Sequence, residues 1–320
     1  MSNAINISLT QYDQRFEAQV VNLWNECLTS DLITLPIFRK QVLFDENFRQ
    51  EFAFCAVDNN TLVGFGFGMK RIFPYLERGV EPEKSWINVV FVKESYRRKG
   101  IGTQLVKCIE EKLNDGLSKK ITLASYSPNY FFPGVDRINY KGSREFFEYN
   151  GYQISGEAVS MSKSLFDYEV PQETIDKVNE LAKVGYRFER FTYNYAFKLL
   201  EFLKNEFGGG WKQNALSLMK TNEAEDTILI CIDKNDDVVG FCMRKMDGFP
   251  MRFGPFGVKA ELRSFGLGGI LFDLMQKEMK SQRLFDLYFL WTHGAGQRFY
   301  ERHGVHVYRE YDLMEKKFEE

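Results

Sequence analysis

A short motif that occurs twice is the feature that most constrains how this chain folds. Residues 92–102 and residues 258–268 carry the same Val, Lys, Arg, Gly and Gly at the same spacing, 166 positions apart. One short glycine motif is weak support for a site. Two copies about half a chain length apart indicate a duplicated domain with a repeated site. A chain of 320 residues is long enough for two domains of roughly 160 residues each.

Two further pairs of segments support the duplication. Each half has a predicted hairpin with Cys nine residues before Gly, at 55–64 and 231–240, and both turns are rich in Asp and Asn. Each half also has Phe, an aromatic residue, Glu and, three residues later, Gly, at 146–151 and 299–304. The repeat therefore extends well beyond the glycines, although the loop before the motif is ten residues shorter in the second half.

The local pattern around each motif predicts an anion site. An apolar run at 86–92 or 253–258 predicts a buried strand, and an amphipathic run at 103–113 or 269–279 predicts a helix. The glycine turn between them lets an anion approach the backbone N–H groups and the positive end of the helix dipole. Basic side chains in the turn add positive charge.

Two common phosphate loops are excluded by the spacing. The Walker motif needs Gly, four residues and then Gly-Lys-Ser/Thr, which neither copy has. The dinucleotide fingerprint needs a third Gly three residues after the second, and neither copy has one there.

Both halves predict the order strand, two helices, hairpin, strand, helix, strand, helix, strand. This order predicts an α+β fold, a mixed α/β sandwich, in two domains at residues 1–165 and 166–320. The polar segment 164–183 is the expected join between them, and Gly208–Gly210 is expected to be a flexible break. The first strand is expected at 5–9, and the strand after the first motif helix at 120–126.

Arg-x-x-Gly-x-Gly with Val five residues before the Arg resembles the acyl-CoA pyrophosphate loop of the GNAT N-acetyltransferase superfamily, in its tandem, two-domain type. The resemblance implies two GNAT-like domains, acetyl-CoA as cofactor, and transfer of an acetyl group to a primary amine of a small molecule. It also implies a set of cofactor-binding residues, in which His293 stands where the family commonly has an asparagine: Val92, Arg97, Arg98, Lys99, Gly100, Ile101, Gly102, Thr103, Val258, Arg263, Ser264, Phe265, Gly266, Leu267, Gly268, Gly269 and His293.

The same resemblance implies a catalytic acid in one half. Family members often use a tyrosine in a Phe-Tyr-x-x-x-Gly segment to protonate the departing thiolate, and Tyr300 matches that position. The first half has Phe147 there, which cannot donate a proton. We therefore expect catalysis in the second half, with the first half binding CoA without this acid or shaping the substrate site.

The general base and the acceptor pocket stay open at this stage. Asn88 and Gly254 occupy the region where relatives often place a glutamate, so a water chain or another carboxylate such as Glu206 could serve. The aromatic loop 130–136 either plugs the end of the sheet or lines an acceptor pocket in which Asp136 attracts an ammonium group. His303 and His306 are expected on the surface.

Composition limits the remaining classes of function. A formal net charge of −2 gives no general reason to expect nucleic acid or an anionic membrane as partner. No apolar run reaches membrane-spanning length and the N-terminus lacks a signal pattern, so we expect a cytoplasmic protein, a monomer or weak homodimer. Five cysteines without a CxxC pair predict reduced thiols and no metal site.

Two other functions compete with N-acetyl transfer. A non-catalytic CoA-binding or regulatory protein would hold cofactor in both loops and modify nothing. Aminoacyl transfer from tRNA, as in tandem-GNAT-fold peptidoglycan enzymes, fits less well, because those proteins lack intact phosphate loops and this chain has no broad basic surface suggested by its charge.

Overall fold

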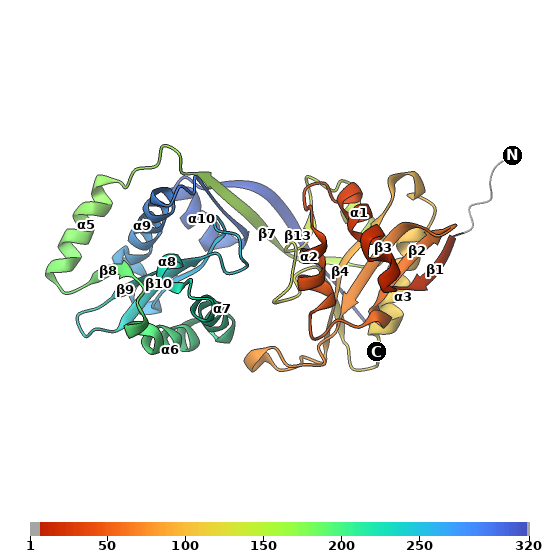
Figure 1. Ribbon diagram of the computed structural model, residues 1–320, viewed down its shortest axis with the longest axis horizontal. Coiled ribbons are helices and arrows are strands. Elements are labelled where there is room, and N and C mark those ends of the chain that lie inside the picture. Colours follow the sequence, from red (N-terminus) through yellow and green to blue (C-terminus); the bar gives the residue numbers. More distant parts are fainter. Residues whose placement is uncertain (1–6, 319–320) are drawn as a thin grey trace. The chain divides into compact units, whose positions relative to one another are not determined.

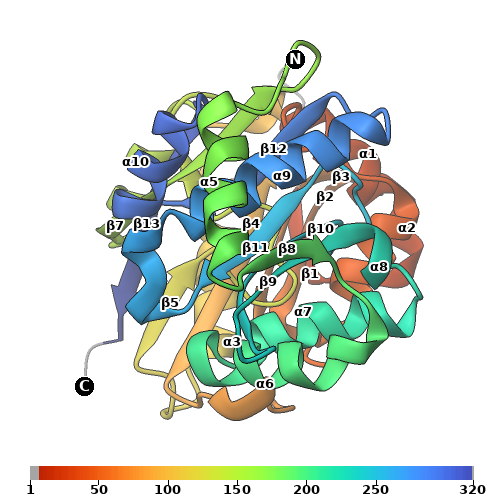
Figure 2. The same ribbon diagram turned by 90° about the vertical axis from the view of Figure 1, so that its left-hand side faces the viewer.

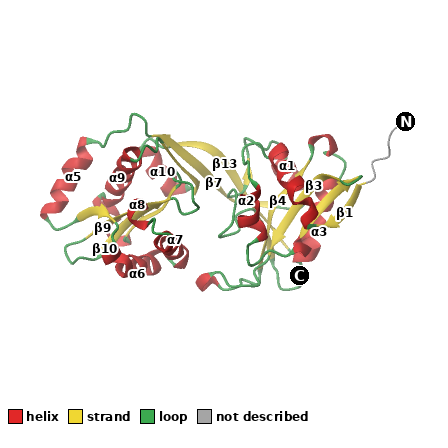
Figure 3. Cartoon of the chain, in the orientation of Figure 1, coloured by secondary structure: helices red, strands yellow, loops and turns green. Residues whose placement is uncertain are grey.

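The computed structural model describes residues 7–318 and divides the chain into two compact units (Figure 1). Unit 1 comprises Met1–Val159 together with Arg309–Glu320, and unit 2 comprises Ser160–Tyr308. Both units combine helices with strands (Figure 3), as the α+β prediction requires. Part of the first predicted strand, residues 5–6, lies outside the described residues; β1 is observed at Ile7–Gln11. No described helix is both long and apolar enough to cross a membrane.

Unit 1 is a sheet with helices on both faces. Its strands pair in the order β1-β2-β3-β4-β5-β13-β7. One apolar cluster packs α1 and α2 against the sheet, and another packs α3 against its opposite face. The bounds of its elements are β1 Ile7–Gln11, α1 Glu17–Cys27, α2 Leu35–Phe38, a π-helical turn Arg39–Leu43, β2 Ala53–Asp58, β3 Thr61–Met69, β4 Lys84–Val92, α3 Ile101–Leu113, β5 Lys120–Leu123, β6 Val135–Asp136, α4 Ser143–Tyr149, β7 Gln153–Ser164 and β13 His306–Lys317.

Glycines on β3 let α3 approach the sheet closely. A Cβ atom added at Gly68 would lie 2.8 Å from Cγ2 of Ile109. The neighbouring Phe65 and Phe67 are fully buried in the cluster on the other face. This alternation brings the start of α3 close to the ends of the central strands.

Unit 2 repeats this plan with a four-stranded sheet in the order β11-β10-β9-β8. An apolar cluster packs α6 and α7 on one face, and α9 contacts β9, β10 and β11. The bounds of its elements are α5 Gln172–Lys183, β8 Arg187–Arg190, α6 Ala196–Phe207, α7 Gly209–Lys220, α8 Ala224–Thr227, β9 Ile228–Ile232, β10 Val238–Arg244, β11 Phe253–Val258, α9 Leu267–Ser281, β12 Asp286–Thr292 and α10 Gly294–Arg302.

Most of the last strand of the chain, from Arg309 onward, belongs to the first unit, whereas the predicted ranges 1–165 and 166–320 place it in the second domain. β13 pairs antiparallel with β5, with Glu315 opposite Thr122 and Lys316 opposite Ile121. Met314 and Tyr311 of this strand are fully buried. No single cut in the sequence separates the two units, because strand pairing brings together segments from the two ends of the chain.

Two helices replace segments that were predicted to be irregular. The expected join at 164–183 contains α5, which lies alongside α9 (Figure 2). The expected glycine break contains the start of α7, because only Gly208 departs from helical geometry, with a φ of 87°. In contrast, β5 is shorter than the predicted 120–126, because Ala124 and Ser125 have positive φ angles of 53° and 50°.

Candidate functional site

The first glycine loop joins β4 to α3. A short 3-10 turn, Glu94–Tyr96, follows the strand, and the hydroxyl of Tyr96 donates to Asp58 Oδ2 at 2.8 Å. Gly100 then adopts a left-handed conformation with φ of 79° as the cap of α3, and no side chain caps the helix. The first N–H groups of the helix are therefore left for a ligand or water, as an anion site requires.

The three basic residues of this loop have different roles. Arg97 donates from Nε to the carbonyl of Val92 at 2.9 Å, which anchors the loop to the end of β4. Lys99 donates to the carbonyl of Ser95 at 2.8 Å. Arg98 is exposed and has no hydrogen-bond or ion-pair partner within residues 7–318. Arg98 is thus the cation of this loop that is best placed to meet an anion.

The second loop has the same left-handed glycine cap and fewer cations. Gly266, with φ of 79°, caps α9 without any side-chain cap. Arg263, Ser264 and Phe265 are exposed, and Arg263 has no ion-pair partner in the described part of the chain. Glu206, considered above as a base, instead accepts the N–H of Ala260 at 3.4 Å. That contact places Glu206 at the turn before the loop.

Several predicted cofactor residues could meet a ligand only through their backbones. Their apolar side chains are buried in the core, so a ligand at the loop can reach only the N–H and C=O groups; these residues are Val92, Ile101, Val258 and Leu267. Gly102, Thr103, Gly268 and Gly269 are partly exposed in the first turn of their helices. A Cβ atom at Gly102 would lie 3.1 Å from the ring of Phe146, so α4 packs directly over this turn.

Each loop lies beside a strand edge that has separated from its neighbour. β4 pairs parallel with β5 up to Trp86–Thr122 and Ile87–Leu123, and no pairing with β5 is present from Asn88 onward in the described chain. In unit 2 the matching contact is a single parallel bridge between Arg252 and Tyr288. The two openings therefore start within one residue of equivalent positions, and each leaves backbone groups free to pair with an extended amide-bearing ligand.

A bulge accompanies each opening. On β4, Val89 lies opposite Phe67 and Ile87 opposite Gly68, so Asn88 between them has no opposite residue. The Asn88 side chain is buried, and its Oδ1 atom has no hydrogen-bond partner among the described residues. A buried acceptor without a partner costs roughly 1–3 kcal/mol. Its presence at the opening indicates a place where a ligand N–H or a water binds.

Tyr300 packs among aromatic side chains between the strands of unit 2. Its ring centroid lies 4.4 Å from that of Phe289 on β12 and 6.2 Å from that of Phe253 on β11. Its hydroxyl has no hydrogen-bond partner within residues 7–318. Burial, and then the nearby Cys242, raise the pKa of Tyr300 well above its ordinary value, so the phenol stays protonated. Phe147, its counterpart, packs 5.6 Å from Tyr152.

His293 is exposed and Asp136 is buried, so the two residues bear differently on their predicted roles. His293 is exposed just before α10, at the end of β12. Asp136 is 3% exposed and accepts a hydrogen bond from Arg309 Nε at 2.6 Å. It also accepts the N–H groups of Ile138 and Asn139. The hypothesis that Asp136 attracts a substrate ammonium is therefore wrong, because this carboxylate is already neutralised inside the unit.

The sequence analysis missed a polar network behind the second loop. Asp273, 4% exposed on α9, accepts hydrogen bonds from Thr174 Oγ1 at 2.6 Å and Tyr168 Oη at 3.0 Å. His303 Nδ1 lies 3.4 Å from the same carboxylate, so His303 is not the simple surface residue that was expected. Burial alone would raise the pKa of Asp273, but His303 and Thr174 hold it below the usual value. The sequence signal that could have revealed this network is Asp273, a charged residue inside an apolar helical run.

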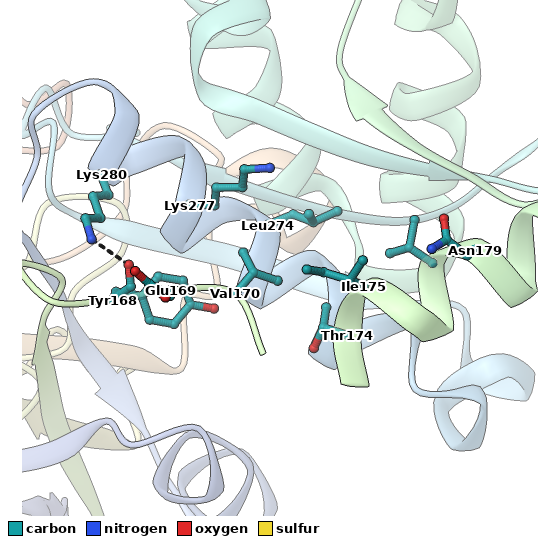
Figure 4. A pocket seen from close by; sticks show the side chains of 10 residues that line it. Tyr168, Glu169, Val170, Thr174, Ile175, Asn179, Leu274, Lys277 and Lys280 are labelled. Carbon is teal, nitrogen blue, oxygen red and sulfur yellow. Dashed lines mark hydrogen bonds between the residues drawn. The ribbon is translucent and has the colours of Figure 1, made fainter. Parts of the chain in front are cut away.

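A groove of about 460 Å³ between α5 and α9 contains none of the predicted site residues (Figure 4). Apolar side chains of Ile175 and Leu274 line it, and Lys277 stands at its side. The Lys280 ammonium donates to the carbonyl of Tyr168 at 2.7 Å. The groove forms because α5 packs beside α9. The two glycine loops remain the candidate sites, because they have the features of an anion site.

The fold and the loops together define a class of protein. A sheet whose central strands separate beside a glycine loop and an uncapped helix start is the architecture of N-acyltransferases that hold an acyl carrier between two strands. Here the architecture occurs twice in one chain.

Comparison with known proteins supports this class. Residues 18–130 match the family model described as the Acetyltransferase (GNAT) family. A search of curated protein sequences finds no significant match. The family match covers residues 18–130, and for the rest of the chain the comparisons show the fold.

Three solved structures illustrate the likeness. A GCN5-related glucosamine N-acetyltransferase region in a fungal multidomain GH3 β-N-acetylglucosaminidase has a TM-score of 0.79 at 18% identity, covering 98% of this chain and 38% of that one. A GCN5-related N-acetyltransferase from Sphaerobacter thermophilus has a TM-score of 0.71 at 14% identity, covering 97% and 95%. A tandem GNAT protein from the clavulanic acid biosynthesis pathway has a TM-score of 0.64 at 12% identity, covering 98% of each chain. At these identities the likeness shows the fold.

Proposed function

We propose that this protein is an acetyl-CoA-dependent N-acetyltransferase that acts on a primary amine of a small molecule. The observation that carries the proposal is the repeated combination of a left-handed glycine cap, at Gly100 and Gly266, with a strand that separates within one residue of equivalent positions. The helix start suits a pyrophosphate, and the free strand edge suits the amides of pantetheine. Both features are needed to hold a thioester for attack by an amine.

Catalysis is proposed for unit 2, with Tyr300 as the proton donor. The phenol would donate to the leaving thiolate, and because burial raises its pKa this contact acts mainly as a hydrogen bond that stabilises negative charge on sulfur. Unit 1 would bind the cofactor through Arg98 and its glycine turn. For the acceptor we propose only a primary amine. Glucosamine is a first acceptor to test, because the name of the fungal relative includes glucosamine N-acetyltransferase.

The decisive experiment reverses one charge in one loop at a time, so that CoA binding at each loop is measured separately. Arg98→Glu and Arg263→Glu alter exposed side chains without partners in the described chain, so folding is preserved. Lys107→Glu, on the exposed side of α3, makes the same charge change outside the loop and serves as control. Losing a charge-assisted contact of about 1.5–3 kcal/mol should weaken CoA binding roughly 10- to 100-fold at one site only.

Calorimetry with CoA should give two sites in the parent protein, and in each single variant one of the two should bind roughly 10- to 100-fold more weakly. Turnover of acetyl-CoA with a panel of amino sugars, polyamines and amino acids should fall with Arg263→Glu and persist with Arg98→Glu. Two bound equivalents with no acetylated product over the panel would support a non-catalytic CoA binder instead. Absence of CoA binding would contradict the proposal altogether.

A further inference from the structure

Helix α5 adds a structural element to the second loop for which unit 1 shows no equivalent among its described elements. It packs along α9, and the hydrogen bond from Thr174 to the buried carboxylate of Asp273 fixes it there. The groove in Figure 4 lies between these two helices. The position of α5 along α9 is therefore set by a buried polar contact, in addition to apolar packing.

Lys177 lies one turn after Thr174 on the same face of α5. Its Nζ atom is 3.7 Å from the position that a Cβ atom on Gly266 would occupy. Lys177 also lies 3.2 Å from Glu173, but that carboxylate is 81% exposed, so the pair is worth little. A mobile cation thus stands directly beside the glycine cap of the second loop.

His303 reaches the same helix start from α10. Its Nδ1 faces Asp273, while Cε1 and Nε2 lie 3.2 and 3.5 Å from the Cβ position of Gly269. The ring packs between Phe272 and Phe299 at centroid distances of 5.5 and 4.6 Å, and Lys163 Nζ donates to the His303 carbonyl at 2.7 Å. In its imidazolium form, the ring donates from Nδ1 to the carboxylate and from Nε2 toward the loop.

The side chains of Lys177 and His303 lie on one side of the helix start. Gly266 and Gly269 are three residues apart, so Lys177 and His303 approach neighbouring positions of the first turn. Gly268 faces the other way, toward the ring of Phe256 on β11, at 3.2 Å from its Cβ position. The pair therefore stands beside the backbone site for a pyrophosphate, away from the strand that would hold pantetheine.

We propose that Lys177 and His303 bind the 3′-phosphate of CoA at the second loop and make that loop selective for the phosphorylated cofactor. The inference rests on the proposed cofactor-binding function of the loop. CoA carries this phosphate on the ribose, separate from the pyrophosphate, so a second group of hydrogen-bond donors beside the glycine turn, the Lys177 ammonium and the His303 ring, suits its shape. In unit 1 the positions matching Asp273 and His303 hold Lys107 and Asn150, and the first loop has no such pair.

The test compares CoA with dephospho-CoA by calorimetry. An Arg98→Glu background weakens the first loop, so that the second loop is the tighter site in the measurement. In this background the second loop should bind CoA roughly 10- to 100-fold more tightly than dephospho-CoA, the ratio expected for charge-assisted contacts to one phosphate. Lys177→Gln and His303→Asn should each lower CoA affinity about tenfold and leave dephospho-CoA affinity unchanged. Lys183→Gln, an exposed change at the end of α5, should alter neither.

The outcomes separate this inference from the function beneath it. Equal binding of the two cofactors, or equal losses for both in the variants, overturns the 3′-phosphate assignment and leaves the loop as a CoA site. No CoA binding in the Arg98→Glu background overturns both. A melting temperature is measured for His303→Asn, since this change touches buried Asp273. If the His303→Asn variant does not fold, the Lys177→Gln variant alone decides the test, because the Lys177 side chain is 48% exposed.

Discussion

The guanidinium of Arg309 donates two hydrogen bonds to the carboxylate of Asp31, at 2.6 and 2.7 Å, although 278 positions of sequence separate the two residues. Its Nε donates to Asp136 at 2.6 Å, and the side chain is 7% exposed. The last strand of the chain therefore brings the cation that pairs with two carboxylates of unit 1, the buried Asp136 and the partly buried Asp31. Unit 1 cannot reach its native state until the end of the chain is in place.

Arg309→Met is expected to destabilise unit 1 by about 3–5 kcal/mol, because it leaves two carboxylates without their partner in a buried site. The measurement is the free energy of urea unfolding, followed by the fluorescence of Trp24 and Trp86. Lys317→Met, on the same strand but exposed, is the matched control and should be neutral within about 0.5 kcal/mol. A neutral result for Arg309→Met would mean that β13 is held by backbone pairing alone.

The same network predicts acid sensitivity. Burial would raise the pKa of Asp136, but Asn139 and Arg309 together hold it below the usual value. A carboxyl with a folded pKa below the unfolded value of about 3.9 contributes stability that is fully present above that pH and lost as pH falls through the folded pKa. Unfolding free energy should thus stay level from pH 7 to about 5 and fall below about pH 4. Asp136→Asn should be less stable at pH 7 and show a shallower fall.

Local features of the sequence were sufficient to predict the two loops. Gly100 and Gly266 specify a left-handed cap by themselves, and the runs on either side specify a strand and a helix, so short-range information determines the turn. The position of the openings follows from the same repeat, since Trp86–Thr122 and Arg252–Tyr288 are equivalent pairs. The roles of individual cofactor residues and of Tyr300 stay predictions.

Non-local contacts explain what the sequence did not indicate. The partner of β5 comes from residues 315–317, and a pairing over such a separation leaves no local pattern. Helix α5 has only a narrow apolar stripe in a polar segment, so its composition resembled a linker. The part played by His303 depends on Asp273 and on the fold that brings α10 to α9. Asp136 was misjudged for the same reason, because its partner Arg309 is 173 positions away.

Asn88 offers a test in which stability and binding should change in opposite directions. Its Oδ1 has no partner in the described structure, so Asn88→Leu should leave unfolding free energy unchanged or raise it by about 1 kcal/mol. If this atom accepts a hydrogen bond from bound cofactor, CoA affinity at the first loop should fall roughly tenfold. Thermal unfolding and calorimetry in an Arg263→Glu background measure the two effects.

The control for this prediction is Asn47, which is buried with its bonds made. Its Oδ1 accepts the N–H groups of Ile72 and Phe73, and its Nδ2 donates to Tyr126. Asn47→Leu should therefore lower stability by about 1–3 kcal/mol. If Asn88→Leu destabilises the protein as much as Asn47→Leu, the Asn88 side chain has a structural role instead.

Tyr300→Phe removes one hydroxyl and keeps the aromatic packing around it. Because this hydroxyl has no hydrogen-bond partner within residues 7–318, stability should change little. Removing one hydrogen-bond donor to charge that develops in the transition state costs about 10²- to 10³-fold, so kcat should fall by about 100-fold or more while CoA affinity stays nearly intact. Phe147→Tyr, the reciprocal change in unit 1, should leave turnover unchanged. An unaltered rate for Tyr300→Phe would remove this residue from the mechanism.

The pH profile gives a second readout for the same residue. Burial raises the pKa of Tyr300 above the ordinary value of about 10, so the donor form persists throughout the usual assay range. The parent enzyme should show no loss of kcat assignable to this phenol up to about pH 10. A basic limb with an apparent pKa below about 9 that disappears in Tyr300→Phe would mean that the phenol is far less buried during turnover.

Gly266→Ala tests whether the left-handed cap itself binds the cofactor. A side chain at φ of 79° costs about 1–2 kcal/mol, and any relaxation rotates the N–H groups at the start of α9. Gly142 caps α4 in the same left-handed region, with φ of 83° and ψ of −4°, so Gly142→Ala imposes similar backbone strain in unit 1, away from the second loop. Both variants should lose similar stability in urea unfolding, whereas only Gly266→Ala should weaken CoA binding at the second loop, by about tenfold or more. Equal CoA affinity in the two variants would show that the cap geometry contributes nothing specific to the anion site.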